Sequence, residues 1–340
     1  MSTITLGKTG ITIEKNGFGC LPIQRISKEE AAKLLRRAYD GGMTYFDTAR
    51  AYSDSEEKVG YAFAGMRDKI VLATKTAATT ADELRADLET SLRMLQTDYI
   101  DVYQFHNPAF CPKPGGEDGL YDAALQAQRE GKIRHISITN HRLAVAQEAI
   151  DSGLYATLQF PFSYLSGEPE QKLVAGCREK GMGFIAMKGM AGGLIRDGYT
   201  AAAYMQTQDI VVPIWGVQHG WELEQFLDCV KNGAELTPER LATIEHDRAE
   251  LSGEFCRGCG YCMPCPMGIE INNCARMSLM LRRAPTKEWL TPEWQEKMKM
   301  IETCLHCGQC ATRCPYGLDT PKLLQENYED YWKVLAENSK

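Results

Sequence analysis

Short apolar runs alternate with amphipathic segments throughout residues 1–231 of this 340-residue chain. Strand-like runs recur eight times, and each is followed by a segment whose apolar residues recur at helical spacing. Strands that alternate with helices form a parallel sheet, and eight such units close into a barrel. We therefore predict an α/β fold, a (β/α)8 TIM barrel. The predicted strands are residues 17–21, 44–47, 70–74, 100–105, 133–139, 156–160, 183–187 and 210–214.

The alternation ends near residue 232, so the chain has a second part with a different organisation. At about 150 residues per domain, a chain of this length suffices for roughly two domains. A hairpin of Thr3–Leu6 and Ile11–Glu14 is expected before the first barrel strand. The predicted parts are a barrel domain at 1–235, a linker helix at 236–252, a helical cysteine-rich domain at 253–320 and a last helix, packing on the barrel, at 321–340.

Eight of the thirteen cysteines fall in two short groups within the C-terminal part. The second group has the C-x2-C-x2-C-x3-C-P spacing by which two-cluster ferredoxins hold 4Fe–4S clusters. Three thiolates in one tight turn reach three irons of one cluster, and the fourth, before a proline, reaches the other cluster. The sequence therefore predicts two 4Fe–4S clusters in a helical ferredoxin-like domain. The predicted ligands are Cys256, Cys259, Cys262, Cys265, Cys304, Cys307, Cys310 and Cys314.

Two other uses of these cysteines fit the sequence less well. The chain opens Met-Ser-Thr-Ile-Thr, without the features of a secretion signal, so we expect a cytoplasmic protein with few disulfides. Structural zinc takes two close pairs of ligands, fewer than these groups supply. The first group leaves two residues between Cys262 and Cys265 rather than three, so the eighth ligand stays open between Cys265, our choice, and Cys274.

The net charge and the hydropathy pattern exclude two classes of partner. A formal charge of −7 provides no basic surface for nucleic acid or for an anionic membrane. No apolar run reaches the roughly 18 residues that a membrane-spanning helix requires. We therefore expect a partner that is a small molecule or another protein.

Four polar residues stand at the carboxyl ends of three consecutive predicted strands. The second strand ends at Asp47, and Tyr52 follows five residues later. Lys75 follows the third strand and His106 follows the fourth. Because the carboxyl ends of barrel strands meet on one face, we expect these four side chains to converge.

The four residue types suit the transfer of a proton to a carbonyl oxygen. Tyrosine is a weak acid with a pKa of about 10, and we expect the Lys75 ammonium to lower the pKa of Tyr52. Asp47 can hold Lys75 in place, and His106 can orient the carbonyl. Each residue alone also has an ordinary structural explanation, such as Asp47 capping a helix, so the prediction rests on the four together.

Phe46-Asp47-Thr48-Ala49 with Tyr52, and Phe105-His106-Asn107-Pro108, resemble the catalytic motifs of the aldo-keto reductase superfamily. The likeness covers residues 1–231, and the whole chain resembles a subgroup with an appended iron–sulfur module. The resemblance implies that Tyr52 is the general acid/base, tuned by Lys75 and Asp47, and that His106 orients the substrate.

The same resemblance implies hydride transfer from a nicotinamide, NAD(P), bound at the barrel mouth. It places Gly19 and Cys20 near the nicotinamide ribose. The residues that it assigns to the carboxamide and to the stretch after the seventh strand are Thr139, Asn140, Gln159, Met187 and Lys188.

One stretch departs from the family pattern. Residues 215–226, where the family places basic residues for the 2′-phosphate of NADP, contain no Lys or Arg. Glu222 and Glu224 would repel such a phosphate, so NAD is favoured over NADP. Met187 also stands where the family has an aromatic residue.

The sequence thus predicts an oxidoreductase that acts on a small carbonyl or alcohol substrate, with the clusters as an electron relay to a ferredoxin or similar partner. Two alternatives stay open. One is an electron-transfer or redox-sensing protein that uses the barrel as a docking platform. The other is a reductive cleavage or elimination that uses the clusters without nicotinamide.

Overall fold

The computed structural model describes residues 3–251, 255–283 and 286–338. The chain divides into two compact units, which we call the barrel unit and the cluster unit. The barrel unit comprises Met1–Gly189 and Gly198–Leu241, and the cluster unit comprises Met190–Asp197 and Ala242–Lys340.

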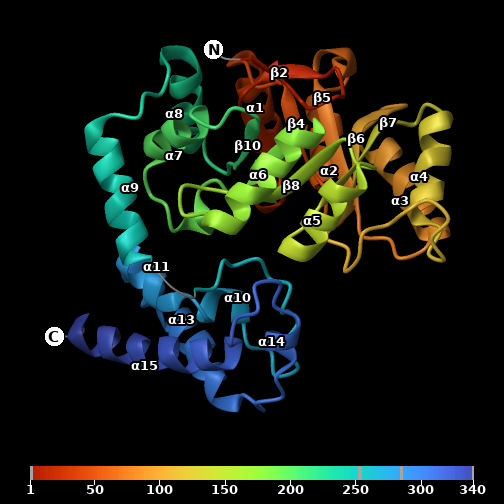
Figure 1. Ribbon diagram of the computed structural model, residues 1–340. Helices are drawn as coiled ribbons and strands as arrows, with labels where there is room; N and C mark the ends of the chain where they lie inside the picture. Colours follow the sequence, from red (N-terminus) through yellow and green to blue (C-terminus); the bar gives the residue numbers. More distant parts are fainter. Residues whose placement is uncertain (1–2, 252–254, 284–285, 339–340) are drawn as a thin grey trace. The chain divides into compact units, whose positions relative to one another are not determined.

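The barrel unit contains a closed barrel of eight parallel strands in the order β10-β3-β4-β5-β6-β7-β8-β9 (Figure 1). The predicted (β/α)8 fold is therefore confirmed. Each strand pairs with the next strand along the chain, so the carboxyl ends of all eight lie on one face. The strands are β3 (Gly17–Gly19), β4 (Tyr45–Asp47), β5 (Val71–Thr76), β6 (Ile100–His106), β7 (Ile133–Thr139), β8 (Thr157–Pro161), β9 (Gly183–Met187) and β10 (Val211–Gly216).

The predicted hairpin precedes the barrel. Strands β1 (Thr3–Thr5) and β2 (Thr12–Glu14) pair antiparallel. The buried side chains of Leu6 and Ile13 join the barrel core, and Gly7 lies so close to the start of β9 that a Cβ there would meet backbone at 2.4 Å. The hairpin therefore covers the amino end of the barrel, opposite the predicted catalytic face.

Helices follow the strands, and their starts are fixed by local sequence. Ser27 and Glu30 form a reciprocal capping box at the start of α1, and Thr80 and Glu83 form another at the start of α3. The helices up to the end of the barrel are α1 (Lys28–Asp40), α2 (Ser55–Ala62), α3 (Ala81–Met94), α4 (Leu120–Arg129), α5 (Leu143–Ser152), α6 (Glu168–Lys180), α7 (Gly198–Gln206), α8 (Gly220–Asn232) and α9 (Pro238–Glu250), with short 3-10 helices at Pro22–Arg25, Arg67–Lys69 and Ala191–Gly193.

The cluster unit is built from shorter helices. Residues 272–283 have a helical sequence pattern, from which we expect one helix, but the structure divides this region into α10 and α11, with the buried Arg276 at the break. The last helix, α15, packs on α10, α11, α13 and α14 of the same unit, and its packing on the barrel stays a prediction. The helices are α10 (Ile271–Cys274), α11 (Met277–Arg283), α12 (Thr286–Trp289), α13 (Pro292–Lys299), α14 (Gln309–Thr312) and α15 (Thr320–Asn338), with a 3-10 helix at Met300–Thr303.

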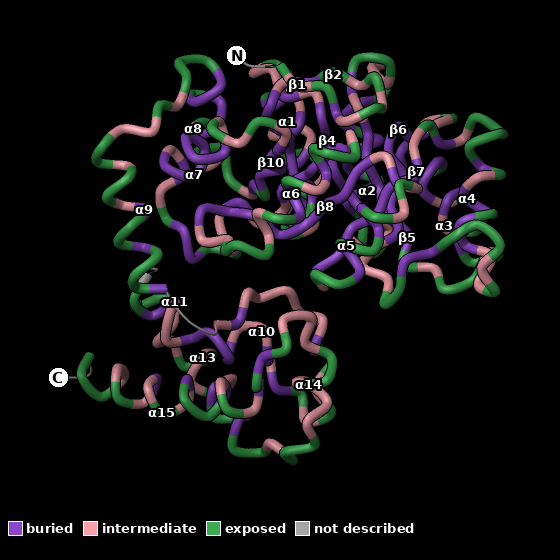
Figure 2. Tube along the Cα trace, in the orientation of Figure 1, coloured by how far each residue is buried: buried purple, intermediate pink, exposed green. Residues whose placement is uncertain are grey.

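Burial differs between the two units. In Figure 2 the barrel strands form a nearly continuous buried core, whereas much of the cluster unit is of intermediate burial or exposed. No helix within the described residues is long and apolar enough to cross a membrane.

Candidate active site and cluster sites

Three neighbouring strands bring most of the predicted catalytic residues to the carboxyl face of the barrel. Asp47 ends β4, in register with Gly19 of β3 and Ala73 of β5. Lys75 lies near the end of β5, and His106 ends β6. Since side chains alternate along a strand, Gln104 points to the same side as His106.

The Asp47 carboxylate is the centre of this site. Lys75 Nζ donates to Asp47 Oδ2 at 2.5 Å and to the Thr48 carbonyl oxygen at 2.6 Å. Gln104 Nε2 donates to Asp47 Oδ1 at 2.9 Å, and Gln159 Nε2 lies 3.3 Å from Oδ2. The Lys75 and Asp47 side chains are only 1% and 3% exposed, so this is a buried, multiply hydrogen-bonded ion pair.

Tyr52 lies on the turn between β4 and α2, beside this ion pair. Its amide donates to the Ala49 carbonyl at 3.0 Å, and its carbonyl accepts from Ser55 at 2.8 Å, so the turn has a fixed conformation. Lys75 Nζ lies 5.1 Å from the centre of the Tyr52 ring. The ring of His106 meets the ring of Tyr52 edge-on, with centroids 5.8 Å apart. The structure therefore brings all four predicted residues together.

The pKa of Tyr52 changes in the direction opposite to the one we expected from Lys75. Burial raises the pKa of Tyr52, and Asp47 and Cys20 raise it further. The positive charge of Lys75 is already balanced by Asp47, so it does not offset burial. Burial, with Lys75 adding to it, lowers the pKa of His106 to about 3. At neutral pH the site therefore holds a protonated phenol and a neutral imidazole.

The two cysteine groups form loops with the same local backbone. In each, the first cysteine sulfur accepts an N–H at 3.4 Å from the residue two positions later, Gly258 to Cys256 and His306 to Cys304. Gly258 and His306 both have positive φ, as do the glycines that follow the second cysteine of each loop. The two loops therefore share one local backbone conformation.

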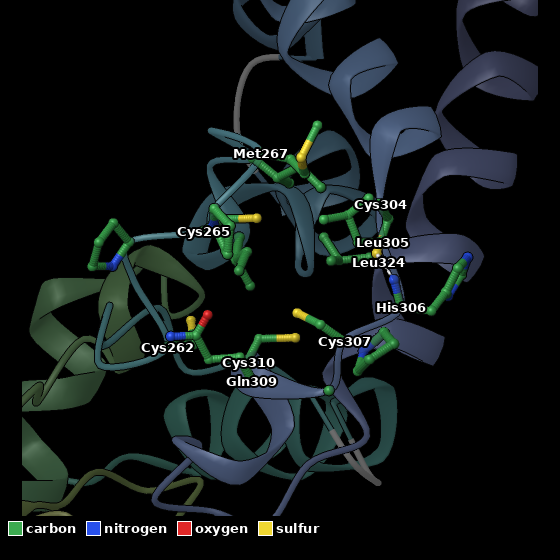
Figure 3. Close-up of a pocket in the computed structure, with 16 residues that line it drawn as sticks. Cys262, Cys265, Met267, Cys304, Leu305, His306, Cys307, Gln309, Cys310 and Leu324 are labelled. Atoms are coloured by element: carbon green, nitrogen blue, oxygen red, sulfur yellow. Dashed lines mark hydrogen bonds between the residues drawn. The ribbon is translucent and has the colours of Figure 1, made fainter.

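The second loop shares its cavity with cysteines from the first group. One cavity of the cluster unit is lined by Cys262 and Cys265 of the first group and by Cys304, Cys307 and Cys310 of the second. Figure 3 shows the sulfurs of Cys265, Cys307 and Cys310 directed into the same space. Thiolate sulfur is the ligand of 4Fe–4S clusters, so this arrangement fits one cluster.

Cys314 belongs to the second group in the sequence but lies near cysteines of the first group. Burial raises the pKa of Cys256, and the neighbouring Cys259 and Cys314 thiols contribute in the same direction. This proximity groups Cys314 with the first loop. Within residues 3–251, 255–283 and 286–338, no three His, Cys, Asp or Glu side chains lie close enough to hold a single metal ion.

Cys274, the reserve ligand, lies elsewhere. Its sulfur is buried 3.8 Å from the Lys297 carbonyl oxygen, and burial raises its pKa to about 12. It does not line the cavity that contains Cys265. This geometry favours Cys265 as the eighth ligand. Cys111, Cys177 and Cys229 are buried, as expected for isolated cysteines.

Comparison with known proteins places both halves of the chain. The model of the aldo/keto reductase family matches residues 3–245. The chain belongs to the aldo/keto reductase family. A model described as a 4Fe-4S dicluster domain matches residues 255–319. The predicted family and the predicted iron–sulfur module are therefore confirmed, and the protein is an oxidoreductase with an appended dicluster domain.

The relatives are other aldo/keto reductases and oxidoreductases. The chain is 28% identical over 256 residues to the uncharacterized oxidoreductase YrpG of Bacillus subtilis. The matched region covers 66% of this chain and 77% of YrpG. It is 32% identical over 197 residues to the aldo-keto reductase YhdN of the same organism, covering 51% and 57% of the two chains.

Solved aldo-keto reductases share the barrel. AKR11C1 from Bacillus halodurans, in a holo form, has a TM-score of 0.64 at 23% identity and covers 73% of this chain and 96% of its own. An aldo-keto reductase from Klebsiella pneumoniae, solved in complex with NADPH, has a TM-score of 0.61 at 26% identity, covering 72% and 95%.

Some of the residues expected at a nicotinamide border the four predicted catalytic residues Asp47, Tyr52, Lys75 and His106, which we call the tetrad. Cys20 is buried, and its amide donates to the Asp47 carbonyl at 2.8 Å, so Gly19 and Cys20 border the site. Among the residues that the structure describes, the buried Gln159 Oε1 has no hydrogen-bond partner, and neither has the buried Gln104 Oε1. Buried amide oxygens are normally paired. An unpaired acceptor at Gln159 fits a ligand that brings its own N–H groups, such as a carboxamide.

Other expected contacts are already used inside the protein. Asn140 Nδ2 donates to the Pro108 carbonyl at 2.9 Å, and its Oδ1 accepts from the amides of His141 and Arg142. Thr139 Oγ1 accepts from the Asn107 amide at 3.1 Å. Met187 ends β9, and Lys188 follows it with a φ of +58°.

The start of α8 shows what the two glutamates do. The Glu222 carboxylate accepts from the amides of Gln218 and His219, each at 2.8 Å. Glu224 forms a bidentate pair with Arg37 at 2.8 and 2.7 Å. A carboxylate of the chain itself therefore caps the amides that could otherwise bind an anion.

Sequence reasoning missed Gln104. Its position two residues before His106 was the available signal, because alternation along the strand places both side chains on the same face.

Proposed function

We propose that this aldo/keto reductase interconverts a carbonyl and an alcohol, with Tyr52 as the general acid/base. The observation that carries the proposal is the convergence of the half-buried Tyr52 phenol, a buried Lys75–Asp47 pair and the His106 ring at one end of the barrel. The raised pKa of Tyr52 keeps the phenol protonated and ready to donate.

Each residue has a distinct part in the reduction. The Tyr52 hydroxyl gives its proton to the carbonyl oxygen while a hydride adds to the carbonyl carbon, which yields the alcohol. The phenolate that remains lies beside the Lys75 ammonium, which Asp47 fixes in position. His106 is neutral, so it can donate an N–H to the carbonyl oxygen without competing for the proton.

A bound nicotinamide would supply the hydride. The similarity to the NADPH complex from Klebsiella pneumoniae supports this cofactor class, and the unpaired Gln159 Oε1 fits its carboxamide. The Glu222 carboxylate accepts from an amide at the start of α8, and the Glu224 carboxylate neutralises Arg37. Both carboxylates therefore oppose the binding of a 2′-phosphate, which favours NAD over NADP.

We assign one cluster to Cys256, Cys259, Cys262 and Cys314, and the other to Cys265, Cys304, Cys307 and Cys310. Cys256 and Cys262 are buried, whereas Cys307 is exposed. The more exposed second cluster suits electron exchange with a ferredoxin or another protein, because its ligands reach the surface of the cluster unit.

Replacing Tyr52 with Phe tests the acid/base assignment. Carbonyl reduction should fall by about 10²–10⁴-fold, the usual contribution of a positioned general acid. The control is Tyr61→Phe, since Tyr61 is 48% exposed and outside the site. Iron and sulfide contents should match the unaltered protein in both variants. Full activity in Tyr52→Phe would reject the proposal.

A second function is favoured by the Glu222 cap and by the engaged Asn140 amide, both of which weaken the case for a bound dinucleotide. In this alternative the reduced clusters supply electrons to an oxygenated substrate, and the tetrad supplies only the proton. Turnover by dithionite-reduced protein, without spectral change on titration with NADH or NADPH, would select it over hydride transfer.

A further inference from the structure

Arg276 is a deeply buried cation in the cluster unit. It is 6% exposed, and its Nη2 donates to the Gly192 carbonyl and lies 3.1 Å from Met280 Sδ. Within the described part of the chain, its Nε has no hydrogen-bond partner. Burying a guanidinium is costly unless an anion or a full set of acceptors compensates it. The two contacts seen here satisfy only part of that requirement.

The backbone makes room for this guanidinium beside the first cysteine loop. A Cβ on Gly258 would lie 2.4 Å from Arg276 Nη1, and a Cβ on Gly192 would lie 2.9 Å from the same nitrogen. Both glycines have positive φ, +62° and +67°. Two glycines therefore border the Arg276 head group, one of them between Cys256 and Cys259.

The first cysteine loop borders the Arg276 head group through Gly258. The same glycine donates its N–H to Cys256 Sγ at 3.4 Å. A thiolate-bound group in this loop would therefore lie beside a buried guanidinium whose positive charge needs an anion.

We propose that Arg276 is the counter-ion of the iron–sulfur cluster held by Cys256, Cys259, Cys262 and Cys314, and that its charge raises the reduction potential of that cluster. The inference rests on the cluster assignment proposed above. Reduction adds one electron from an external one-electron donor and makes an anionic cluster more negative, with no bond formed or broken. A fixed positive charge therefore favours the reduced form.

The test is a potentiometric titration followed by electron paramagnetic resonance, on full-length protein purified without oxygen, with dithionite as the donor. Arg276→Met and Arg276→Gln remove the charge, and Arg276→Lys keeps it. The control is Arg282→Met, because Arg282 lies on α11 of the same unit but is 48% exposed and pairs with Asp330. Iron and sulfide are counted in every variant.

Both neutral variants should lower one midpoint potential by at least tenfold in the reduction equilibrium, about 59 mV for one electron. Arg276→Lys should keep most of the original value, and Arg282→Met should change neither potential. Loss of one cluster in the neutral variants but not in Arg276→Lys would also support the counter-ion role.

Unchanged potentials in the neutral variants, with both clusters present, would overturn the inference. So would loss of a cluster in a folded Arg276→Lys variant, because shape rather than charge would then matter. Iron and sulfide for fewer than two clusters in the unaltered protein would instead refute the cluster assignment itself.

Discussion

The barrel unit and the cluster unit are stabilised in different ways. The barrel has eight paired strands, helices of 8 to 14 residues around them, and a buried core in which aromatic and aliphatic side chains pack. Three helices of the cluster unit, α10, α12 and α14, have only four residues each. Helices this short are unstable in water without tertiary support. The stability of the barrel therefore depends on its apolar core, whereas the stability of the cluster unit depends on its cysteines.

The largest expected effect is on the cluster unit alone. Removing iron with a chelator, without oxygen, should unfold residues 255–319 and leave the barrel folded, because metal binding supplies folding free energy where the core is small. Hydrogen exchange read by mass spectrometry should show lost protection there and unchanged protection in β3 to β10. Equal loss in both units would contradict the comparison.

A smaller effect, on the iron and sulfide content, should distinguish Cys265 from Cys274 in the cluster unit. Cys265→Ser should remove about half of the iron and sulfide, because Cys265 lines the cavity with the second loop. Cys274→Ser should retain all of it, because that sulfur faces the Lys297 carbonyl. Iron and sulfide analysis of the two variants is the measurement. Loss of half of the iron in Cys274→Ser but not in Cys265→Ser would make Cys274 the ligand.

In the barrel the most sensitive polar element is the buried ion pair. Lys75→Met should lower the free energy of unfolding by about 3–5 kcal/mol, because Asp47 would be left buried without its counter-charge. Asp47→Asn combined with Lys75→Met should recover much of that loss without recovering activity. Denaturant unfolding of the barrel measures both, and additive losses would show that the pair is not coupled.

A smaller change is expected at the start of α8. Glu222→Gln removes a negative charge from the amides of Gln218 and His219. The preference for NADH over NADPH should fall by about tenfold, which is about 1.4 kcal/mol. Ratios of kcat/KM give the answer, with Glu239→Gln on α9 as an exposed control. An unchanged ratio would separate Glu222 from cofactor choice.

The smallest effect concerns pH. His106 has a lowered pKa, about 3, so it stays neutral well below the usual value of 6.5. Carbonyl reduction should therefore show no loss from His106 between about pH 7 and about pH 5. The stability that comes from its neutral form is complete above pH 6.5 and declines as the pH falls toward 3. An acid limb near 6.5 that disappears in His106→Asn would contradict this.

The sequence predicted the barrel more fully than the cluster unit. Apolar runs gave 133–139 and 183–187 with the bounds that the structure has, because most residues of each strand are buried. The helix expected at 272–283 is broken at Arg276, because the cysteine loops, not periodicity, determine the path there. Local patterns report local structure, and they carry little information on a fold that ligands organise.

The candidate site shows the same division. Asp47 and Lys75 were found because they stand at strand ends, which a sequence reveals. The sign of the change in the Tyr52 pKa was missed, because it depends on how deeply the ring is buried and on which charge Lys75 already balances. These are properties of three-dimensional packing, and no spacing along the chain encodes them.

The short segment Met190–Asp197 has a consequence for how this protein can be divided or rebuilt. The chain leaves the barrel unit after Gly189, returns to it at Gly198, and leaves it again after Leu241. A single cut in the chain therefore cannot separate the two units. A gene fragment that ends at residue 241 would encode the segment Met190–Asp197 without the residues of the cluster unit with which it packs. Exchange of the iron–sulfur module between relatives would succeed only if the segment Met190–Asp197 were exchanged together with it.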